Sequence, residues 1–163
     1  MNVQPKVVRG VIATALFAAA AAVVLPAFAH HSFAIFDSET TKVFTGVVTR
    51  VNPDANHLQV FFAPMNKEHT NVERGPDGKP ITWAVEMAGS AQAAKDGISV
   101  STFAPGTIFS VALHPLRSGE PAGSREAAMF KCPEKKPPAP GKHCDSVDGS
   151  VKFGEGDFPK PTE

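Results

Sequence analysis

Residues 42–63, with the sequence KVFTGVVTRVNPDANHLQVFFA, decide the fold of this chain. From Lys42 to Val51, a β-branched residue occupies every second position and would lie on one face, as in a half-buried strand. Residues 52–56 are rich in Asn, Pro and Asp, which favours a turn. A second alternating run covers His57–Ala63, and its less apolar face carries His57. We therefore expect these two strands to pair as a β-hairpin.

The chain continues as short strands that are separated by turn residues. Further strands are expected at Ile81–Met87, at Thr107–His114 and, with a weaker pattern, at Arg125–Lys131. Between the first two of these, a short alanine-rich segment predicts a helix, with Ser90 as its N-cap and Gly97 as its stop.

Three strands, a short helix and two more strands form the order of a five-stranded OB-type barrel. A small open β-sandwich would produce nearly the same pattern, so it stays open as the alternative. The fold class that we expect is therefore all-β with one short helix. The 15 prolines and 13 glycines agree with it, because both residue types interrupt long helices. We assign residues 42–131 to the OB-like domain, 30–41 to an N-terminal arm and 132–163 to a Pro/Gly-rich tail with little regular structure.

Residues 1–29 have the composition of a signal peptide. Lys6 and Arg9 form a basic start, an apolar run follows, and Ala27-Phe28-Ala29 places small residues at both recognition positions of the cut. Cleavage is expected between Ala29 and His30, which predicts a periplasmic or secreted protein without stable membrane insertion. The alternative is an uncleaved membrane anchor, since residues 10–29 are uncharged.

Net charge excludes one class of partner. The whole chain has 16 basic and 16 acidic residues, and removal of the leader takes away two positive charges. The mature chain would then carry a formal charge of −2, with no basic stripe. Nucleic acid is therefore not expected as a partner, and a protein partner cannot be named from the sequence.

Cys132 and Cys144 are the only cysteines. In an exported protein they are expected to form a disulfide bond that closes a proline-rich loop. The alternative makes Cys132, His143 and Cys144 soft metal ligands.

The most distinctive chemistry would arise at the predicted cut, where the mature chain begins His30-His31-Ser32-Phe33. An N-terminal histidine can offer its amine and its Nδ1 atom to one metal ion, and one further imidazole would complete a planar set of three nitrogens that suits Cu(II). This arrangement is called a histidine brace. His57 and His114 are the expected third ligands, and His31 could contribute only through a different, strained chelate.

Other groups give weaker signals. His69 and His143 are expected to be solvated, and none of the common nucleotide-binding, zinc-protease or serine-hydrolase motifs is present. No motif therefore points to an enzyme, and the sequence leaves enzymatic activity undecided, with a protein that is not an enzyme favoured.

Several short segments together resemble a family of small exported bacterial proteins that is catalogued as a domain of unknown function. They are His30–Asp37, Phe44–Val48, Trp83–Glu86 and Pro105-Gly106. The resemblance covers roughly His30 to Arg125 and implies no established activity.

Two details bear on the candidate ligands. Family members typically have Asn-Pro-His where this chain has Asn52–His57, so its histidine is displaced by three places, which weakens His57. The segment His114–Gly119 resembles the His-Pro-Leu-Arg form of some members, which supports His114. The tail that contains Cys132 and Cys144 is an addition to the common core.

These observations lead to one functional expectation and two alternatives. We expect an exported protein that binds copper through His30, with His57 or His114 or both, for metal carriage or sequestration. The first alternative is an envelope interaction or ligand-binding module that uses no metal. A lower-ranked alternative is a copper-dependent oxidoreductase, because a brace leaves coordination positions open.

Overall fold

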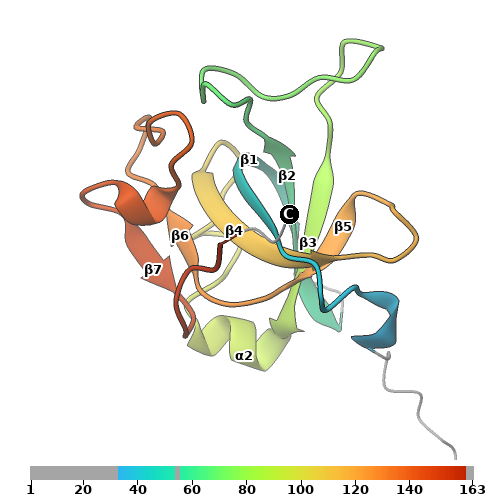
Figure 1. Cartoon of the computed structure of the whole chain (residues 1–163). Coiled ribbons are helices and arrows are strands. Elements are labelled where there is room, and N and C mark those ends of the chain that lie inside the picture. Colours follow the sequence, from blue (N-terminus) through green and yellow to red (C-terminus); the bar gives the residue numbers. More distant parts are fainter. Residues whose placement is uncertain (1–32, 54–55, 161–163) are drawn as a thin grey trace, which may run out of the picture. The chain divides into compact units, whose positions relative to one another are not determined.

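The computed structural model of this protein describes residues 33–53 and 56–160 (Figure 1). The expected leader and its cleavage site, together with His30 and His31, lie outside these residues. Within them, no helix is long and apolar enough to cross a membrane.

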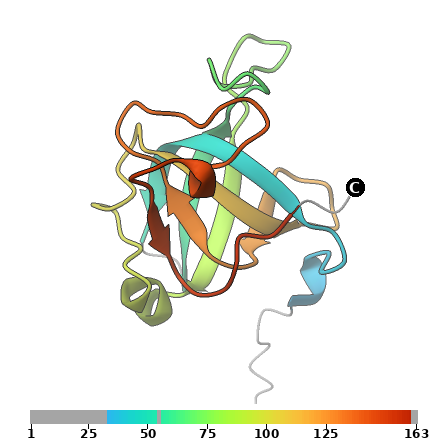
Figure 2. The same cartoon turned by 60° about the vertical axis from the view of Figure 1, so that its left-hand side comes forward.

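Five strands close into a barrel, with two further strands outside the ring (Figures 1 and 2). The ring runs in the order β1-β2-β3-β5-β4, and β4 pairs back with β1. The β3–β5 pairing is parallel, and the other pairings of the ring are antiparallel. The five strands are β1 (Lys42–Asn52), β2 (His57–Pro64), β3 (Trp83–Gly89), β4 (Ile108–Pro115) and β5 (Ala122–Arg125).

This architecture confirms the predicted fold class. The barrel is closed, so the open β-sandwich is excluded, and one short helix, α2 (Ser90–Lys95), stands between β3 and β4. The predicted hairpin is the β1–β2 pair, with Val51 opposite Val60. A connection between two strands of a parallel pair must cross over, and the route from β3 to β5 does so through α2 and β4.

The barrel interior is filled by alternate side chains of the strands. Val60 and Phe62 of β2, Val85 of β3 and Phe109 of β4 are fully buried in it. Along β1 the alternation shifts, because the β1–β2 register slips between Val48 and Arg50. The slip adds one residue to β1 between these two positions. Strict alternation would turn Val51 outward, but with the extra residue Val51 packs against the same core as Val48.

Only the two ends of the predicted fifth strand, Arg125–Lys131, lie in strands, and it is not the fifth strand of the ring. The fifth strand of the ring is β5, which ends at Arg125, and Met129–Lys131 forms β6, which pairs with β4 outside the ring. Residues 122–125 read Ala-Gly-Ser-Arg and lack the apolar alternation that identifies a strand. Gly123 is needed there, because a Cβ atom at this position would collide with the His114 carbonyl oxygen.

The predicted N-cap of the helix is also wrong by one residue. Gly89 is the N-cap, with φ −49° and ψ 150°, and it provides no side-chain hydrogen bond, whereas Ser90 is already helical. The predicted stop is confirmed, since Gly97 has φ 76°, a left-handed conformation that glycine adopts readily.

The tail is more regular than its composition suggested. It contains the short helix η3 (Cys144–Ser146) and the strand β7 (Val151–Phe153), which pairs with β6. The predicted disulfide bond joins Cys132 to Cys144, so neither sulfur is available as a metal ligand. We call residues 133–143, the loop that this bond closes, the strap.

The strap covers part of the outer surface of the barrel. Thr45 and Ser110 face each other on β1 and β4, on the side opposite the core, yet they are only 4% and 0% exposed. The prediction that His69 and His143 are solvated is wrong for the same reason. His69 is 9% exposed and His143 is half-buried, because both lie where the strap meets the barrel.

Candidate functional site

A row of polar residues crosses the outer face of three neighbouring strands. His114 of β4 is paired with Ser124 of β5, which is paired with Glu86 of β3. Residues that are directly opposite each other in a sheet point to the same side. Leu113 and Val85, their chain neighbours, point into the core, so the polar row lies on the outside of the barrel.

His57 extends this row at the start of β2. Its Nδ1 atom lies 3.0 Å from Oε1 of Glu86, and the two side chains are 40% and 31% exposed. An ionised carboxylate only accepts hydrogen bonds, so Nδ1 carries the hydrogen. In the neutral ring, Nε2 then keeps the lone pair that a metal ligand needs, which is the usual carboxylate–histidine arrangement of metal sites.

His114 is oriented in the same way by a different acceptor. Its Nδ1 atom lies 3.1 Å from the carbonyl oxygen of Thr40, which can only accept. Glu126 Oε2 is 4.0 Å from the same nitrogen and accepts a hydrogen bond of 2.7 Å from the Thr41 hydroxyl. The His114 side chain is 23% exposed. Its Nε2 atom is therefore the ligand nitrogen in the neutral ring, as in His57.

The acceptor Thr40 belongs to the N-terminal arm, which is attached beside the end of β4. The arm begins with the short helix η2 (Phe33–Ile35), whose Ile35 carbonyl accepts a hydrogen bond of 2.9 Å from the amide of Arg117. Asp37 donates its amide to the Pro115 carbonyl at 2.8 Å. These bonds hold the start of the described chain close to the strand end that carries His114.

Asp37 gives the arm an ionisable contact. Its carboxylate accepts a hydrogen bond of 2.7 Å from the Thr40 hydroxyl and lies 3.6 Å from the Arg117 guanidinium. The Thr40 hydrogen bond is the main cause that lowers the pKa of Asp37 below 3.8. The carboxylate is thus ionised at neutral pH, with His114 contributing a smaller part of the same effect.

His57 also opens onto a cavity of about 350 Å³ next to α2. Four carboxylates line it, together with Arg125, whose guanidinium is paired with one of them, Asp96. The cavity therefore carries an excess of negative charge. The other three carboxylates are Glu86, Glu126 and Glu155.

The structure brings the two expected third ligands onto one face but does not cluster them. His57 lines the cavity and His114 does not. Within residues 33–53 and 56–160, no group of three His, Cys, Asp or Glu side chains is placed to hold a metal ion. His30 and His31 are outside the described chain. Of the expected ligand set, the structure thus describes two separate imidazoles.

The sequence signals the group that orients His57 but not the groups that orient His114. The alternation in β3 places Glu86 on the outer face, which was a usable signal for its contact with His57. Thr40 and Glu126 left no such signal, because their contacts with His114 depend on how the arm and the segment after β5 return to β4.

The comparisons with known proteins identify a family but not an activity. The sequence profile of a family of unknown function, DUF6152, matches residues 17–125. The chain belongs to this family. No curated protein and no solved structure matches the chain. The family match ends with β5, so β6, the strap and β7 lie beyond it and the polar row lies within it.

Proposed function

We propose that the exported chain, cut before His30, binds a transition-metal ion, with copper as the first candidate. The amine and Nδ1 of His30 would supply two nitrogens, and Nε2 of His114 would supply the third. The observation that carries the proposal is the hydrogen bond of His114 Nδ1 to the Thr40 carbonyl, because it leaves Nε2 as the basic nitrogen.

Chain length supports His114 as the third ligand. His30 precedes Phe33 by three residues, a span of up to roughly 10 Å in an extended chain. The arm that follows Phe33 is hydrogen-bonded to Pro115 and Arg117, directly after His114. Only a few residues separate His30 from this hydrogen-bonded arm. Binding of the free amine near His114 would therefore cost little chain entropy, which favours chelation.

His57 supports the same chemistry as a second imidazole on this face. Its Glu86 partner would raise the basicity of Nε2 and stabilise the metal-bound ring. Carriage or sequestration needs only the metal ligands themselves, so we place it before catalysis. A copper-dependent oxidoreductase remains the lower-ranked form of the proposal.

A Cu(II) titration of two forms of the chain tests the proposal. The first form begins at His30, and the second carries one additional alanine before it. The extra residue moves the free amine away from the His30 ring, so we expect at least tenfold weaker binding and loss of nitrogen hyperfine structure in the EPR spectrum. Intact-mass analysis of the exported protein establishes the cut beforehand. Equal affinity of the two forms would rule out the brace.

Matched variants identify the third ligand. Asparagine places its amide nitrogen where histidine has Nδ1, so His114→Asn keeps a donor for Thr40 while removing Nε2. We expect this variant to bind Cu(II) more weakly and to fold normally. His57→Asn is the control with the same chemistry at Glu86. If only His57→Asn weakens binding, then His57 and not His114 is the third ligand.

The cavity next to His57 favours a second candidate, a ligand-binding module that uses no metal. Its surplus of carboxylates suits a small cationic ligand such as an amine. A negative metal titration, followed by NMR shift mapping with simple amines, would support this reading if the shifts cluster at Glu86 and Glu155.

A further inference from the structure

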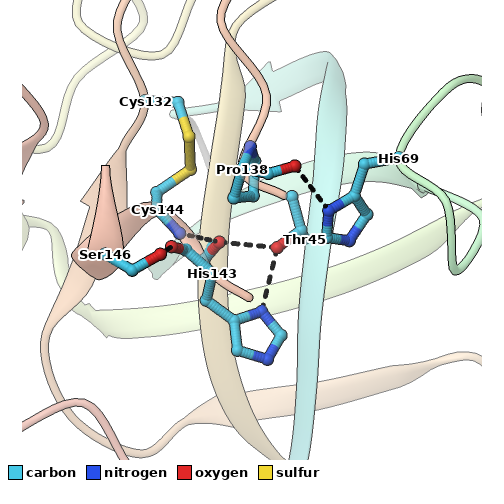
Figure 3. The surroundings of a disulfide bond; sticks show 8 residues. Thr45, His69, Cys132, Pro138, His143, Cys144 and Ser146 are labelled. Atoms are coloured by element: carbon cyan, nitrogen blue, oxygen red, sulfur yellow. Dashed lines mark hydrogen bonds between the residues drawn. A yellow bond between two sulfur atoms is a disulfide. The ribbon is translucent and has the colours of Figure 1, made fainter. Parts of the chain in front are cut away.

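A continuous hydrogen-bond chain joins the barrel, which lies within the family match, to the strap and Cys144, which lie beyond it (Figure 3). The Cys144 amide donates to Ser110 Oγ at 2.9 Å, and Ser110 Oγ lies 2.7 Å from Thr45 Oγ1. Thr45 Oγ1 in turn lies 2.9 Å from Nδ1 of His143. The chain thus ends on a histidine ring that is half-buried.

Counting donors and acceptors determines the direction of every bond. Ser110 is fully buried, and among the described residues the only acceptor for its hydroxyl hydrogen is Thr45 Oγ1. Thr45 then has only Nδ1 of His143 to receive its own hydrogen. Each hydroxyl has one hydrogen to donate, so the chain runs from Cys144 through Ser110 and Thr45 to His143. The ring must therefore accept at Nδ1.

Only a neutral His143 ring can accept this hydrogen bond, since a protonated imidazole has a hydrogen on both nitrogens. Protonation would place two hydrogens between Nδ1 and Thr45 Oγ1, or leave a buried hydroxyl without an acceptor. An unpaired buried polar group destabilises the state that contains it. Protonation of His143 therefore destabilises the closed strap.

The surroundings of His143 point in the same direction. Burial is the main cause that lowers the pKa of His143 below 6.5, Asp145 of η3 opposes this, and His69 of the loop after β2 adds to it. Lys67 and Glu73 of that loop line a second cavity, which His143 also lines, and the Phe158 ring lies 5.5 Å from the His143 ring. Asp145 thus opposes the neutral ring, while burial and His69 favour it.

We propose that His143 is a pH-sensitive latch, and that protonation of its ring releases the strap from Thr45 and opens the cavity beneath it. That cavity measures about 340 Å³ and is lined by β1, the end of β2, the following loop and the strap. The disulfide bond keeps both ends of the strap attached to the barrel. Gly141, with φ 70°, gives the chain a flexible point two residues before the latch.

A second histidine contact remains in place during release. His69 donates from Nδ1 to the Pro138 carbonyl at 3.1 Å, and a protonated ring can still make this bond (Figure 3). His69 therefore holds the middle of the strap at any pH, and the change is confined to its end at His143.

NMR titration of the disulfide-bonded chain from pH 8 to pH 5 tests the latch. We expect the His143 ring to titrate below 6.5. As the pH falls from 6.5 to the pKa of the closed state, amide exchange of Cys144 should become faster by up to about tenfold for each pH unit. This rate is corrected for the intrinsic pH dependence of exchange. Unchanged protection of Cys144 from pH 8 to pH 5, with a titrating ring, would overturn the proposal.

Two variants separate the latch from a general effect of acid. His143→Asn keeps an acceptor oxygen for Thr45 but cannot take up a proton, so the exchange of Cys144 should become independent of pH. His69→Asn keeps the donor to Pro138 and should leave the pH dependence as in the original chain. A pH dependence that persists in His143→Asn, or disappears in His69→Asn, contradicts the assignment of the latch to His143.

Discussion

At the scale of single residues, hydrogen-bond partners decide what each histidine can do. His57 and His114 both have an acceptor at Nδ1, which leaves Nε2 as the basic nitrogen. His143 has a donor at Nδ1 instead, so its ring is held in the other tautomer. Four described histidines thus divide into two candidate metal ligands, one latch and one fixed contact, His69.

The hydroxyl of Thr45 gives a first prediction at this scale. Thr45→Val keeps the shape of the side chain but removes the donor to His143, so protonation of the ring no longer competes with a hydrogen bond. We expect the pKa of His143 to move up toward 6.5 and the unfolding free energy to fall by about 1–2 kcal/mol. NMR titration of the ring and urea unfolding measure the two effects.

Thr49→Val is a suitable control for that variant, because Thr49 is an exposed threonine of the same strand. We expect no change in the His143 titration. A His143 pKa that stays in place in Thr45→Val would show that burial alone keeps the ring neutral.

Gly123 gives a second prediction. A Cβ atom there would meet the His114 carbonyl oxygen and the Leu113 side chain, so Gly123→Ala must push β5 away from β4. We expect a loss of about 1–3 kcal/mol of unfolding free energy, as for other overpacked sites. A cost near zero would mean that the β4–β5 spacing adapts freely. Because Ser124 and His114 are opposite each other, NMR shifts of the His114 ring should report any such displacement.

At the scale of elements, α2 lacks a cap that one substitution can supply. Gly89 has the extended backbone of an N-cap, and a Cβ atom there meets nothing within 4 Å. Gly89→Ser should therefore add a hydrogen bond to the first turn and stabilise the protein by about 0.3–0.5 kcal/mol. Thermal unfolding measures this, and a lower Tm would show that Gly89 is needed for the bend between β3 and α2.

The strap depends on its disulfide bond. Replacing both Cys132 and Cys144 by serine removes the cross-link from the unfolded chain, and we expect a loss of about 3 kcal/mol in the chain-entropy estimate. The closed barrel lies within residues 42–125, which supply all of the buried core cluster except Met129, so its NMR signals should remain dispersed. Loss of this signal dispersion would instead show that the barrel does not fold without the disulfide-bonded tail.

At the scale of the whole molecule, two groups make stability depend on pH. The lowered pKa of His143 means that the unfolded chain takes up a proton more readily, so its contribution is complete above 6.5 and is lost as the pH falls toward the lower folded value. The pKa of Asp37 is also lowered in the folded chain, so its contribution to stability is complete above 3.8 and is lost as the pH falls further. We therefore expect Tm to fall in two steps on acidification.

Calorimetry between pH 8 and pH 3 checks this expectation with matched variants. His143→Asn should remove the step near neutrality and keep the acid step, and Asp37→Asn should do the reverse. Persistence of the first step in His143→Asn would assign it to another group.

The sequence by itself determined the strands with strong alternation, the hairpin, the short helix and the pairing of its two cysteines. These features depend on local periodicity, on turn residues or on the absence of any other partner. It did not locate β5, because Ala122–Arg125 is held by Gly123 packed against β4 and not by an apolar pattern.

Only the tertiary structure decided the chemistry of the histidines. The contacts of His114 with Thr40 and of His143 with Thr45 join residues 74 and 98 positions apart. Such contacts depend on barrel closure and on the covering strap, which local sequence does not encode. The physical reason is that a tautomer and a buried charge are set by the partner at a few ångströms, wherever in the chain that partner lies.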